Sequence, residues 1–299
     1  MKTIETLVPD IKKLFEGHTL EEHLATGFAN GLADMFVRRF KEYGEDDKDS
    51  LRLSNIGWPT RKLWYSVKGY KGTPLAPEDK VKFLYGDVLE SLFVFLAIQA
   101  GHSVTDLQKE VEIEGVKGHI DCIIDGVLVD VKSCSTFSYA KFVNGGLYDN
   151  DPFGYIAQLS AYKQATKASE AGWLIIDKTH GNFQYVRMDR GQRNVSMVKH
   201  TGIKIQPIKD VLNQSKEPER CYTDKPNDKS GNRILDIGCQ YCPYKIHCWR
   251  DCNEGRGLQE RFYSNGVRYF TKLLKEPKLK SQSDTFITDE QFPTRKLKE

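Results

Sequence analysis

The sequence predicts an α/β protein with a central mixed sheet flanked by helices, plus a C-terminal subdomain built around cysteines. Three observations support this fold class: the apolar hairpin pattern of residues 118–133, helical spacing of apolar residues before and after it, and four cysteines crowded into residues 239–252. At 299 residues, with 39% hydrophobic and 28% charged side chains, the chain can bury a substantial core. We therefore expect a folded globular protein and not a disordered one.

The N-terminal part of the chain is expected to be helical. Apolar side chains recur near helical spacing over residues 10–45, and the run Gly44–Asp47 ends the pattern. A second helix is expected over residues 78–100. Its most apolar stretch, Leu92–Ile98, is far shorter than the ~20 residues that span a bilayer, and the first residues resemble no secretory signal. We expect a cytoplasmic location and no membrane contact.

The central feature is a hairpin whose own register brings acidic side chains together. Asp125-Gly126 between two apolar, β-branched runs favours a two-residue type I′ turn. Counting back from the turn places Asp121 opposite Asp130, with the intervening pairs Cys122–Val129, Ile123–Leu128 and Ile124–Val127. Because side chains alternate along a strand, Asp121, Asp130 and Lys132 share one face, and apolar residues cover the other.

Two carboxylates about 5 Å apart repel each other unless a proton or a cation lies between them. The alternative, a solvated hairpin with ordinary surface charges, is disfavoured because like charges opposite each other destabilise a sheet and because the segment is too apolar for an exposed ribbon. The sequence therefore predicts a divalent metal site beside Lys132.

The remaining elements are expected from local patterns. In order, they are a loop at 135–151, a helix at 154–168, strands Trp173–Asp177 and Phe183–Arg187 joined by a turn, a helix at about 189–200, and a polar, lysine-rich tail at 276–299. The sequence contains no internal repeat and no glycine-rich phosphate loop, so ATP hydrolysis by this chain is not expected.

The seven cysteines indicate metal ligands and buried thiols in a reducing compartment, not a disulfide framework. A C-x2-C-x5-C spacing with a proline and short intervals suits a knuckle around a metal; its cysteines are Cys239, Cys242 and Cys248. The candidates for a fourth ligand are Cys221 and Cys252. His247 inside the knuckle is an alternative zinc ligand, whereas Cys122 and Cys134 are expected to be buried small hydrophobes.

The D-x8-D-V-K pattern after a hairpin resembles the PD-(D/E)XK nucleases, specifically their RecB-type branch. Three further segments resemble motifs of that branch in the same order: Phe83–Phe93, a helix that contains Glu90; Gly154–Tyr162, a Q-x-x-x-Y motif; and Cys239–Cys248, which resembles the cysteine segment of iron–sulfur members, including nucleases of CRISPR spacer acquisition. Together these matches span about residues 54–252, most of the chain.

The resemblance implies a restriction-endonuclease-like core and assigns roles to its residues. One or two Mg²⁺ or Mn²⁺ ions would be held by Glu90, Asp121, Asp130 and the backbone carbonyl of Val131. Lys132 would position or deprotonate the nucleophile. Gln158 and Tyr162, four residues apart on one helical face, would lie against the active site and the DNA.

The resemblance also implies a 4Fe–4S cluster, with tetrahedral zinc on the same thiolates as the alternative. Iron–sulfur relatives carry a cysteine where this chain has Trp58 in the run Trp58-Pro59-Thr60-Arg61-Lys62. Cys221 is the preferred replacement ligand because it would clamp a distant segment onto the knuckle, and Cys252 is the alternative. The expected ligand set is Cys221, Cys239, Cys242 and Cys248.

The net charge of the chain is only +3, so binding of nucleic acid would depend on a local patch of positive charge and not on the charge of the whole chain. Residues 58–71 mix cations with aromatic side chains, a combination suited to phosphate contact and base stacking, and we expect Arg61 and Lys62 to contact DNA. The equally weighted alternative is an amphipathic helix with Leu63 and Trp64 in the core and its lysines in solvent.

The expected function is a metal-dependent DNA exonuclease in recombination, end processing or replication. Its expected partners are single-stranded or double-stranded DNA ends and a helicase or recombination protein; a phage or mobile-element origin in a bacterial host fits the compact size. A non-cleaving recruitment module and a structure- or sequence-specific endonuclease remain alternatives. We expect four parts: helical residues 1–50, nuclease core 51–215, cysteine segment 216–260, and extension and tail 261–299.

Overall fold

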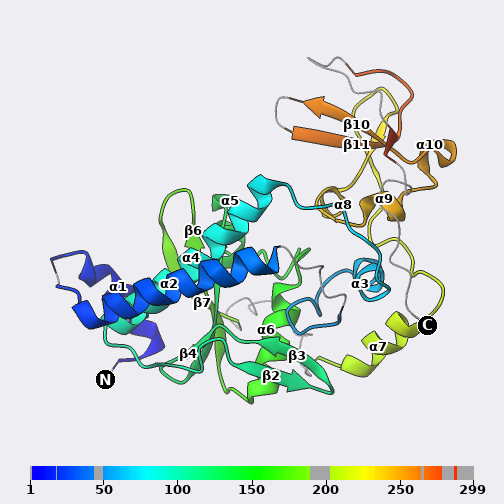
Figure 1. The fold of residues 1–299 in the computed structure, drawn as a ribbon. Helices are drawn as coiled ribbons and strands as arrows, with labels where there is room; N and C mark the ends of the chain where they lie inside the picture. Colours follow the sequence, from blue (N-terminus) through cyan, green and yellow to red (C-terminus); the bar gives the residue numbers. More distant parts are fainter. Residues whose placement is uncertain are drawn as a thin grey trace. The chain divides into compact units, whose positions relative to one another are not determined.

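The computed structural model describes residues 2–17, 19–43, 50–188, 203–263, 266–277 and 286–287. The chain divides into two compact units, one made of Met1–Gly57 and Ala76–Ile205, the other of Trp58–Leu75 and Gln206–Glu299 (Figure 1). The helix expected at 189–200 and most of the expected tail at 276–299 lie outside the described residues. Within the described residues no helix is both long enough and apolar enough to cross a membrane.

The first unit is built on a five-stranded mixed sheet. Its strand order is β1-β4-β5-β6-β7, where β1 is Val104–Thr105, β4 Cys122–Ile124, β5 Val127–Cys134, β6 Ala171–Asp177 and β7 Phe183–Arg187. β5 and β6 are parallel, and the other neighbouring pairs are antiparallel. Helices lie on both faces, so the expectation of an α/β fold with a central mixed sheet is confirmed at this level.

The β4–β5 hairpin has the register that its sequence predicts. Its paired residues are Cys122–Val129, Ile123–Leu128 and Ile124–Val127. Asp125 and Gly126 both have positive φ, 49° and 82°, as a type I′ turn requires. The Asp125 carboxylate also accepts a hydrogen bond from the Ser103 backbone N–H at 3.1 Å, which ties the turn to the start of β1.

One face of this sheet is covered by α1 (Leu7–Leu14), preceded by the 3₁₀ turn η1 (Ile4–Thr6), and by α4 (Pro77–Gln99). The shared core contains the alternate side chains of β4, β5 and β6, namely Cys122, Ile124, Val127, Val129, Val131, Leu174 and Ile176. At about 25 cal/mol per Å² of buried apolar surface, this layer is the main source of stability for the unit.

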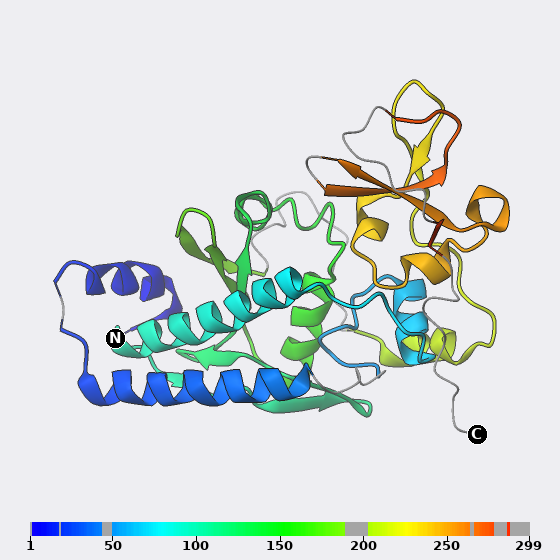
Figure 2. The same ribbon diagram turned by 45° about the horizontal axis from the view of Figure 1, so that its top comes forward.

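The expected helical region 10–45 is two helices, α1 and α2 (Glu22–Glu42). The break between them contains Gly17, whose φ of 100° suits glycine and does not occur in a right-handed helix. α2 lies antiparallel to α4 (Figure 2): Glu21 before α2 bonds Gln99 at the end of α4, and Arg39 late in α2 bonds Asp87 in the middle of α4.

The opposite face of the sheet carries α5 (Thr136–Val143) and α6 (Tyr155–Thr166). α5 lies where an irregular loop is expected. Ser135 makes this helix possible, because its hydroxyl accepts a hydrogen bond from the Ser138 N–H at 3.3 Å and so caps the first turn. Phe142 of α5 packs edge-on against Trp173 of β6, with ring centroids 5.5 Å apart.

A second hairpin, β2 (Glu110–Ile113) with β3 (Val116–His119), was not expected from the sequence. It packs beside α6, and Gly118 makes the close approach possible. A Cβ at Gly118 would stand 2.8 Å from the Leu53 side chain and 2.9 Å from the Tyr162 ring. The glycine therefore leaves the space that the Tyr162 ring occupies.

The second unit combines short helices with an antiparallel sheet of order β12-β10-β11-β9-β8. Its helices are α3 (Thr60–Val67), α7 (Ile205–Asn213, whose first residue belongs to the first unit), α8 (Ile237–Gln240), α9 (Lys245–Cys248) and α10 (Cys252–Gly255). Its strands are β8 (Lys225–Pro226), β9 (Arg233–Ile234), β10 (Leu258–Tyr263), β11 (Gly266–Lys272) and β12 (Phe286–Ile287). The sequence pattern did not predict this sheet.

We predict that Gly118→Ala lowers the free energy of unfolding by about 1–3 kcal/mol, because the added methyl overpacks the contact with Leu53 and Tyr162. Denaturant unfolding of the purified protein measures this. Gly27→Ala and Gly31→Ala on α2 are matched controls: a Cβ there meets nothing within 4 Å, so each should raise stability by about 0.5–1 kcal/mol. Equal stability of Gly118→Ala and the parent would contradict the packing role.

Candidate active site

β5 carries a buried ion pair on the face that α5 and α6 cover. Asp130 and Lys132 point to the same side of the strand, and the Lys132 ammonium donates to Asp130 Oδ1 at 2.8 Å. The Asp130 side chain is only 2% exposed and that of Lys132 21%. The other carboxylate oxygen of Asp130, Oδ2, is buried and has no hydrogen-bond partner. A buried, unsatisfied carboxylate oxygen is costly unless a cation or donor reaches it.

Asp121 lies just before β4, beyond the last ladder pair of the hairpin. The expected contact with β5 was a direct cross-strand pair of Asp121 with Asp130. Instead, Asp121 Oδ2 accepts a hydrogen bond from the Val131 N–H at 2.7 Å. This bond places Asp121 against the segment that carries Asp130 and Lys132. Burial, and after it the negative charge of Asp130, raises the pKa of Asp121 well above its usual range.

Glu90 approaches the pair from α4. Its Oε1 accepts a hydrogen bond from Gln108 Nε2 at 2.5 Å. Burial, with the negative charges of Asp130 and Asp87, outweighs the attraction of Lys132 and raises the pKa of Glu90 to about 7. The structure thus places Glu90, Asp121, Asp130 and Lys132 near enough for their charges to affect one another; that they form one metal-binding site stays a prediction.

The charges of the site do not balance. Burial raises the pKa of Asp130 as well as those of Asp121 and Glu90, whereas the neighbouring carboxylates raise the pKa of Lys132 above its ordinary value despite its burial. Three carboxyl groups therefore share one ammonium. Such a set favours an added cation, and its all-oxygen donors suit a hard divalent ion.

The carboxylates do not yet converge on one point. Within the described parts of the chain, no three His, Cys, Asp or Glu side chains stand close enough together to hold a metal ion. The reason is visible at the site: Glu90 is turned to Gln108, Asp121 to the Val131 N–H and Asp130 to Lys132. Binding of an ion would require rotation of these side chains, and the unpartnered Asp130 Oδ2 is the oxygen that is available without it.

Gln158 and Tyr162 of α6 lie on one helical face, as their spacing predicts, and are close enough for Gln158 to affect the pKa of the Tyr162 phenol. Burial and the charge of Asp130 raise the pKa of Tyr162 to about 12, so the phenol keeps its proton. Both residues line a groove of about 620 Å³ between α2 and α4, and Glu90 and Asp121 line it too. The groove thus leads to the carboxylates.

Two residues of this groove were missed by the sequence reasoning. Arg39 of α2 holds Asp87 through two hydrogen bonds of 2.6 and 2.7 Å. Asp87 lies one helical turn before Glu90, and the pair Arg39–Asp87 affects the pKa of Glu90. The signal was available in part, because Asp87 stands in the same apolar helical segment, but its arginine partner is 48 residues away.

The cysteines of the second unit lie near one another, but among the described residues no three of them are close enough to hold a metal ion as they stand. Cys248 and Cys242 raise the pKa of Cys239, and Cys242 raises that of Cys248. Cys221 contributes to the raised pKa of Cys242, and both Cys248 and Cys252 pack against the apolar cluster that contains Cys239. Burial raises the thiol pKa of Cys239 to about 12 and that of Cys248 to about 11. Cys252 instead responds to Asp251 and Arg220.

Arg61 and Lys62 lie in the second unit, on α3 and next to the thiols. The Arg61 guanidinium is 2.7 Å from Glu217 and 3.0 Å from the Pro218 carbonyl oxygen. Lys62 lies over the Trp58 ring, 3.5 Å from its centroid, and burial lowers its pKa. The buried Leu63 and Trp64 match the alternative interpretation of an amphipathic helix. DNA contact by Arg61 and Lys62 stays a prediction.

Three other residues named from the sequence have clear positions. Cys122 is fully buried in the core of the first unit, and Cys134 is partly buried at the end of β5. His247 is buried, and its Nε2 donates to the Lys71 carbonyl oxygen at 2.9 Å. That bond directs this nitrogen of His247 to the backbone and not to a thiol-bound ion.

Comparisons with known proteins add little at this level. The chain matches no protein-family model and no curated protein. It has structural similarity to the crystal structure of SSO0001 (13% identity, TM-score 0.36, covering 74% of this chain and 95% of that one). It also resembles a phage-related exonuclease from Haemophilus somnus 129PT (13% identity, TM-score 0.24, covering 57% of this chain and 66% of that one). At these TM-scores neither similarity carries a functional argument.

We predict that Glu90→Gln stabilises the metal-free protein, and that the gain grows between about pH 4.5 and pH 7. The folded protein keeps the Glu90 proton up to a pKa of about 7, whereas the unfolded chain releases it near 4.5. Stability of the parent therefore falls as pH rises through this window. Glutamine does not titrate, so thermal melts in a chelator should give equal melting temperatures below the window and a higher one for the variant above it.

Asp79→Asn, which removes a carboxyl paired with Lys82 on the same helix, is the control for Glu90→Gln. If the difference in melting temperature between Glu90→Gln and the parent does not change with pH, the pKa of Glu90 is not raised in the folded protein.

Proposed function

We propose that the first unit is a PD-(D/E)XK-type nuclease core of the RecB branch and that it hydrolyses phosphodiester bonds in DNA with the help of Mg²⁺ or Mn²⁺. The observation that carries the proposal is the buried Asp130–Lys132 pair on β5, with a free carboxylate oxygen and with Asp121 and Glu90 beside it. An exonuclease acting on DNA ends is the form that the motif order favours.

Glu90, Asp121, Asp130 and the carbonyl of Val131 would hold one or two ions. A bound ion supplies Lewis acidity at the scissile phosphate and lowers the pKa of a coordinated water. The protein contributes three carboxyl groups whose pKa values are raised by burial and, at Asp121 and Glu90, also by neighbouring negative charge; a bound cation would stabilise their charged forms.

Lys132 has a positioning and electrostatic role in this scheme. Asp130 and Asp121 raise its pKa, so it keeps its proton at neutral pH and is unsuited to act as a general base. Its ammonium can hold the attacking water by hydrogen bonding and offset charge that develops on the phosphate. Gln158 and Tyr162, which line the groove beside the carboxylates, would orient the DNA strand without holding the ion.

For the second unit we propose a 4Fe–4S cluster on Cys221, Cys239, Cys242 and Cys248, with zinc on the same thiolates as the alternative. Support comes from the influence of neighbouring thiols on the pKa values of Cys239, Cys242 and Cys248, and from the positive charges of Lys62 beside Cys242 and Arg61 beside Cys248. Cys239 is buried and Cys242 and Cys248 are partly buried, whereas Cys221 is exposed. Cations next to buried thiols favour the thiolate forms that ligation requires.

We predict that Asp121→Asn, Asp130→Asn and Lys132→Gln each lower the rate of metal-dependent DNA cleavage at least ~100-fold, because each removes several kcal/mol of charge stabilisation in the transition state. The assay uses linear single-stranded and double-stranded DNA labelled at either end, and closed circular DNA, with Mg²⁺, Mn²⁺ or a chelator. Asp79→Asn is the matched control, and circular dichroism checks folding.

Cleavage of linear but not closed circular DNA would support an exonuclease, and cleavage of both an endonuclease. Near-normal cleavage by Asp130→Asn would remove the proposed site. Binding of DNA without cleavage at any metal concentration would leave the non-cleaving recruitment module as the function.

We predict that Cys221→Ser loses the metal centre and that Cys252→Ser keeps it, because Cys221 lies near Cys242 and, as a ligand, would tie a distant segment of the chain to the knuckle. Iron, sulfide and zinc are to be measured on protein purified without oxygen. Cys134→Ser in the first unit is the control for removal of a thiol. A full metal complement in Cys221→Ser with loss in Cys252→Ser would reverse the ligand assignment, and a metal-free parent would end the cluster proposal.

A further inference from the structure

Three aromatic rings that differ in exposure lie close to the Lys132 ammonium. The Lys132 nitrogen lies 5.9 Å from the centroid of the Tyr155 ring. The Tyr155 ring contacts Phe142, which is 3% exposed, with a centroid distance of 5.6 Å. It also contacts Phe153, which is 52% exposed, again with a centroid distance of 5.6 Å. The most exposed of the three rings therefore offers a free face within two side chains of the proposed catalytic centre.

The turn that presents Phe153 is held in one conformation. Gly154 has a φ of 76°, and a Cβ on it would lie 2.4 Å from the backbone of Gly57, so only glycine is accommodated. The Asp151 carboxylate accepts hydrogen bonds from the N–H groups of Gly154 at 2.9 Å and Ile156 at 2.8 Å. An exposed aromatic ring on a fixed turn loses little conformational entropy when a flat partner stacks on it.

The exposed aromatic ring suits a nucleobase as its binding partner. Aromatic side chains beside a phosphate-binding centre suit nucleobases, because every base has a flat face and stacking tolerates any sequence. A base inside a duplex already stacks on its neighbours, whereas the last base of a single strand has a face to offer. Tyr155, which Phe153 contacts, also lies next to the positively charged Lys132, which suits the phosphate attached to that base.

We propose that Phe153, supported by Tyr155, stacks on the terminal unpaired base of a DNA strand and so makes the active site prefer single-stranded ends. This inference rests on the proposed nuclease function and names its substrate. Phe153 would act by positioning the strand and would not take part in bond cleavage.

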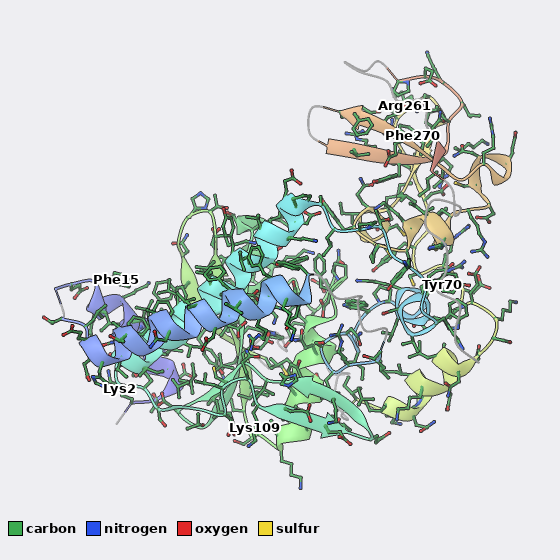
Figure 3. All side chains as sticks on the ribbon, in the orientation of Figure 1. Lys2, Phe15, Tyr70, Lys109, Arg261 and Phe270 are labelled. Atoms are coloured by element: carbon green, nitrogen blue, oxygen red, sulfur yellow. The ribbon has the colours of Figure 1, made fainter. Side chains whose placement is uncertain are left out.

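The first test measures binding without cleavage, in a chelator. Single-stranded oligonucleotides carry 2-aminopurine at the 5′ or the 3′ terminal position, and stacking quenches its fluorescence. We expect Phe153→Ala to weaken binding by about five- to 150-fold, the range that corresponds to ~1–3 kcal/mol per stacked base. Phe153→Trp, which keeps a ring, should bind like the parent. Phe15→Ala is the matched control, since Phe15, which directly follows α1, lies outside the proposed site and is 72% exposed (Figure 3).

The decisive comparison repeats the titration with an abasic residue at each end in turn. For one of the two ends, removal of the base should weaken binding by the parent, and Phe153→Ala should then have no further effect. If Phe153→Ala loses the same factor on abasic and normal strands at both ends, the ring does not contact the terminal base and the inference is wrong.

Cleavage assays separate this inference from the function on which it rests. If stacking occurs, Phe153→Ala should raise KM for single-stranded ends and change kcat little, and the effect on blunt duplex ends should be small. If the parent cleaves DNA and Phe153→Ala has the same KM and kcat as the parent on single-stranded and on blunt duplex ends, the stacking inference alone is wrong. If the parent never cleaves DNA but its binding responds to Phe153→Ala and to the abasic residue as described above, the nuclease proposal alone is wrong.

Discussion

The ion pair between Asp130 and Lys132 is the constraint around which the first unit is arranged. β5 presents apolar side chains to the core on one face and these two opposite charges on the other. Either charge buried alone would be unfavourable by several kcal/mol, so each makes the burial of the other tolerable. Because the two residues are two apart on one strand, the pair forms wherever β5 forms. The neighbouring Asp121 and Glu90 then find themselves in a pocket with more negative than positive charge.

Local patterns in the sequence are sufficient to predict many of the helices and strands of the first unit. The alternation of the hairpin and its Asp125-Gly126 turn predict the register of β4 and β5, and the apolar runs around residues 173 and 185 predict β6 and β7. α5 was not predicted, because the Gly- and Asn-rich composition after it obscures a short helix whose start depends on the Ser135 cap. In the sheet of the second unit, β9 and β12 are only two residues long and pair with β11 and β10, which are not their neighbours across a simple turn, so local patterns do not predict them.

The site shows the same division between local and distant contacts. Positions on one strand face, such as Asp130 and Lys132, follow from periodicity. The contact of Asp121 with the Val131 N–H does not, because the ladder stops one residue earlier than simple counting implies. Nor could the sequence indicate that Arg61 meets Glu217, 156 residues away, and that this partner accounts for a buried arginine on α3.

The contact between Gly57 and Gly154 has a consequence for the order in which the first unit assembles. The two backbones touch although they are roughly a hundred residues apart, and a loop of that length loses considerable entropy when it closes. Contacts of this kind are expected late in folding, after the hairpin and helices have formed locally. The turn before α6 would therefore acquire its shape only in the completed unit, and an incompletely folded chain, even with its hairpin in place, would present no ordered edge to a nucleic acid.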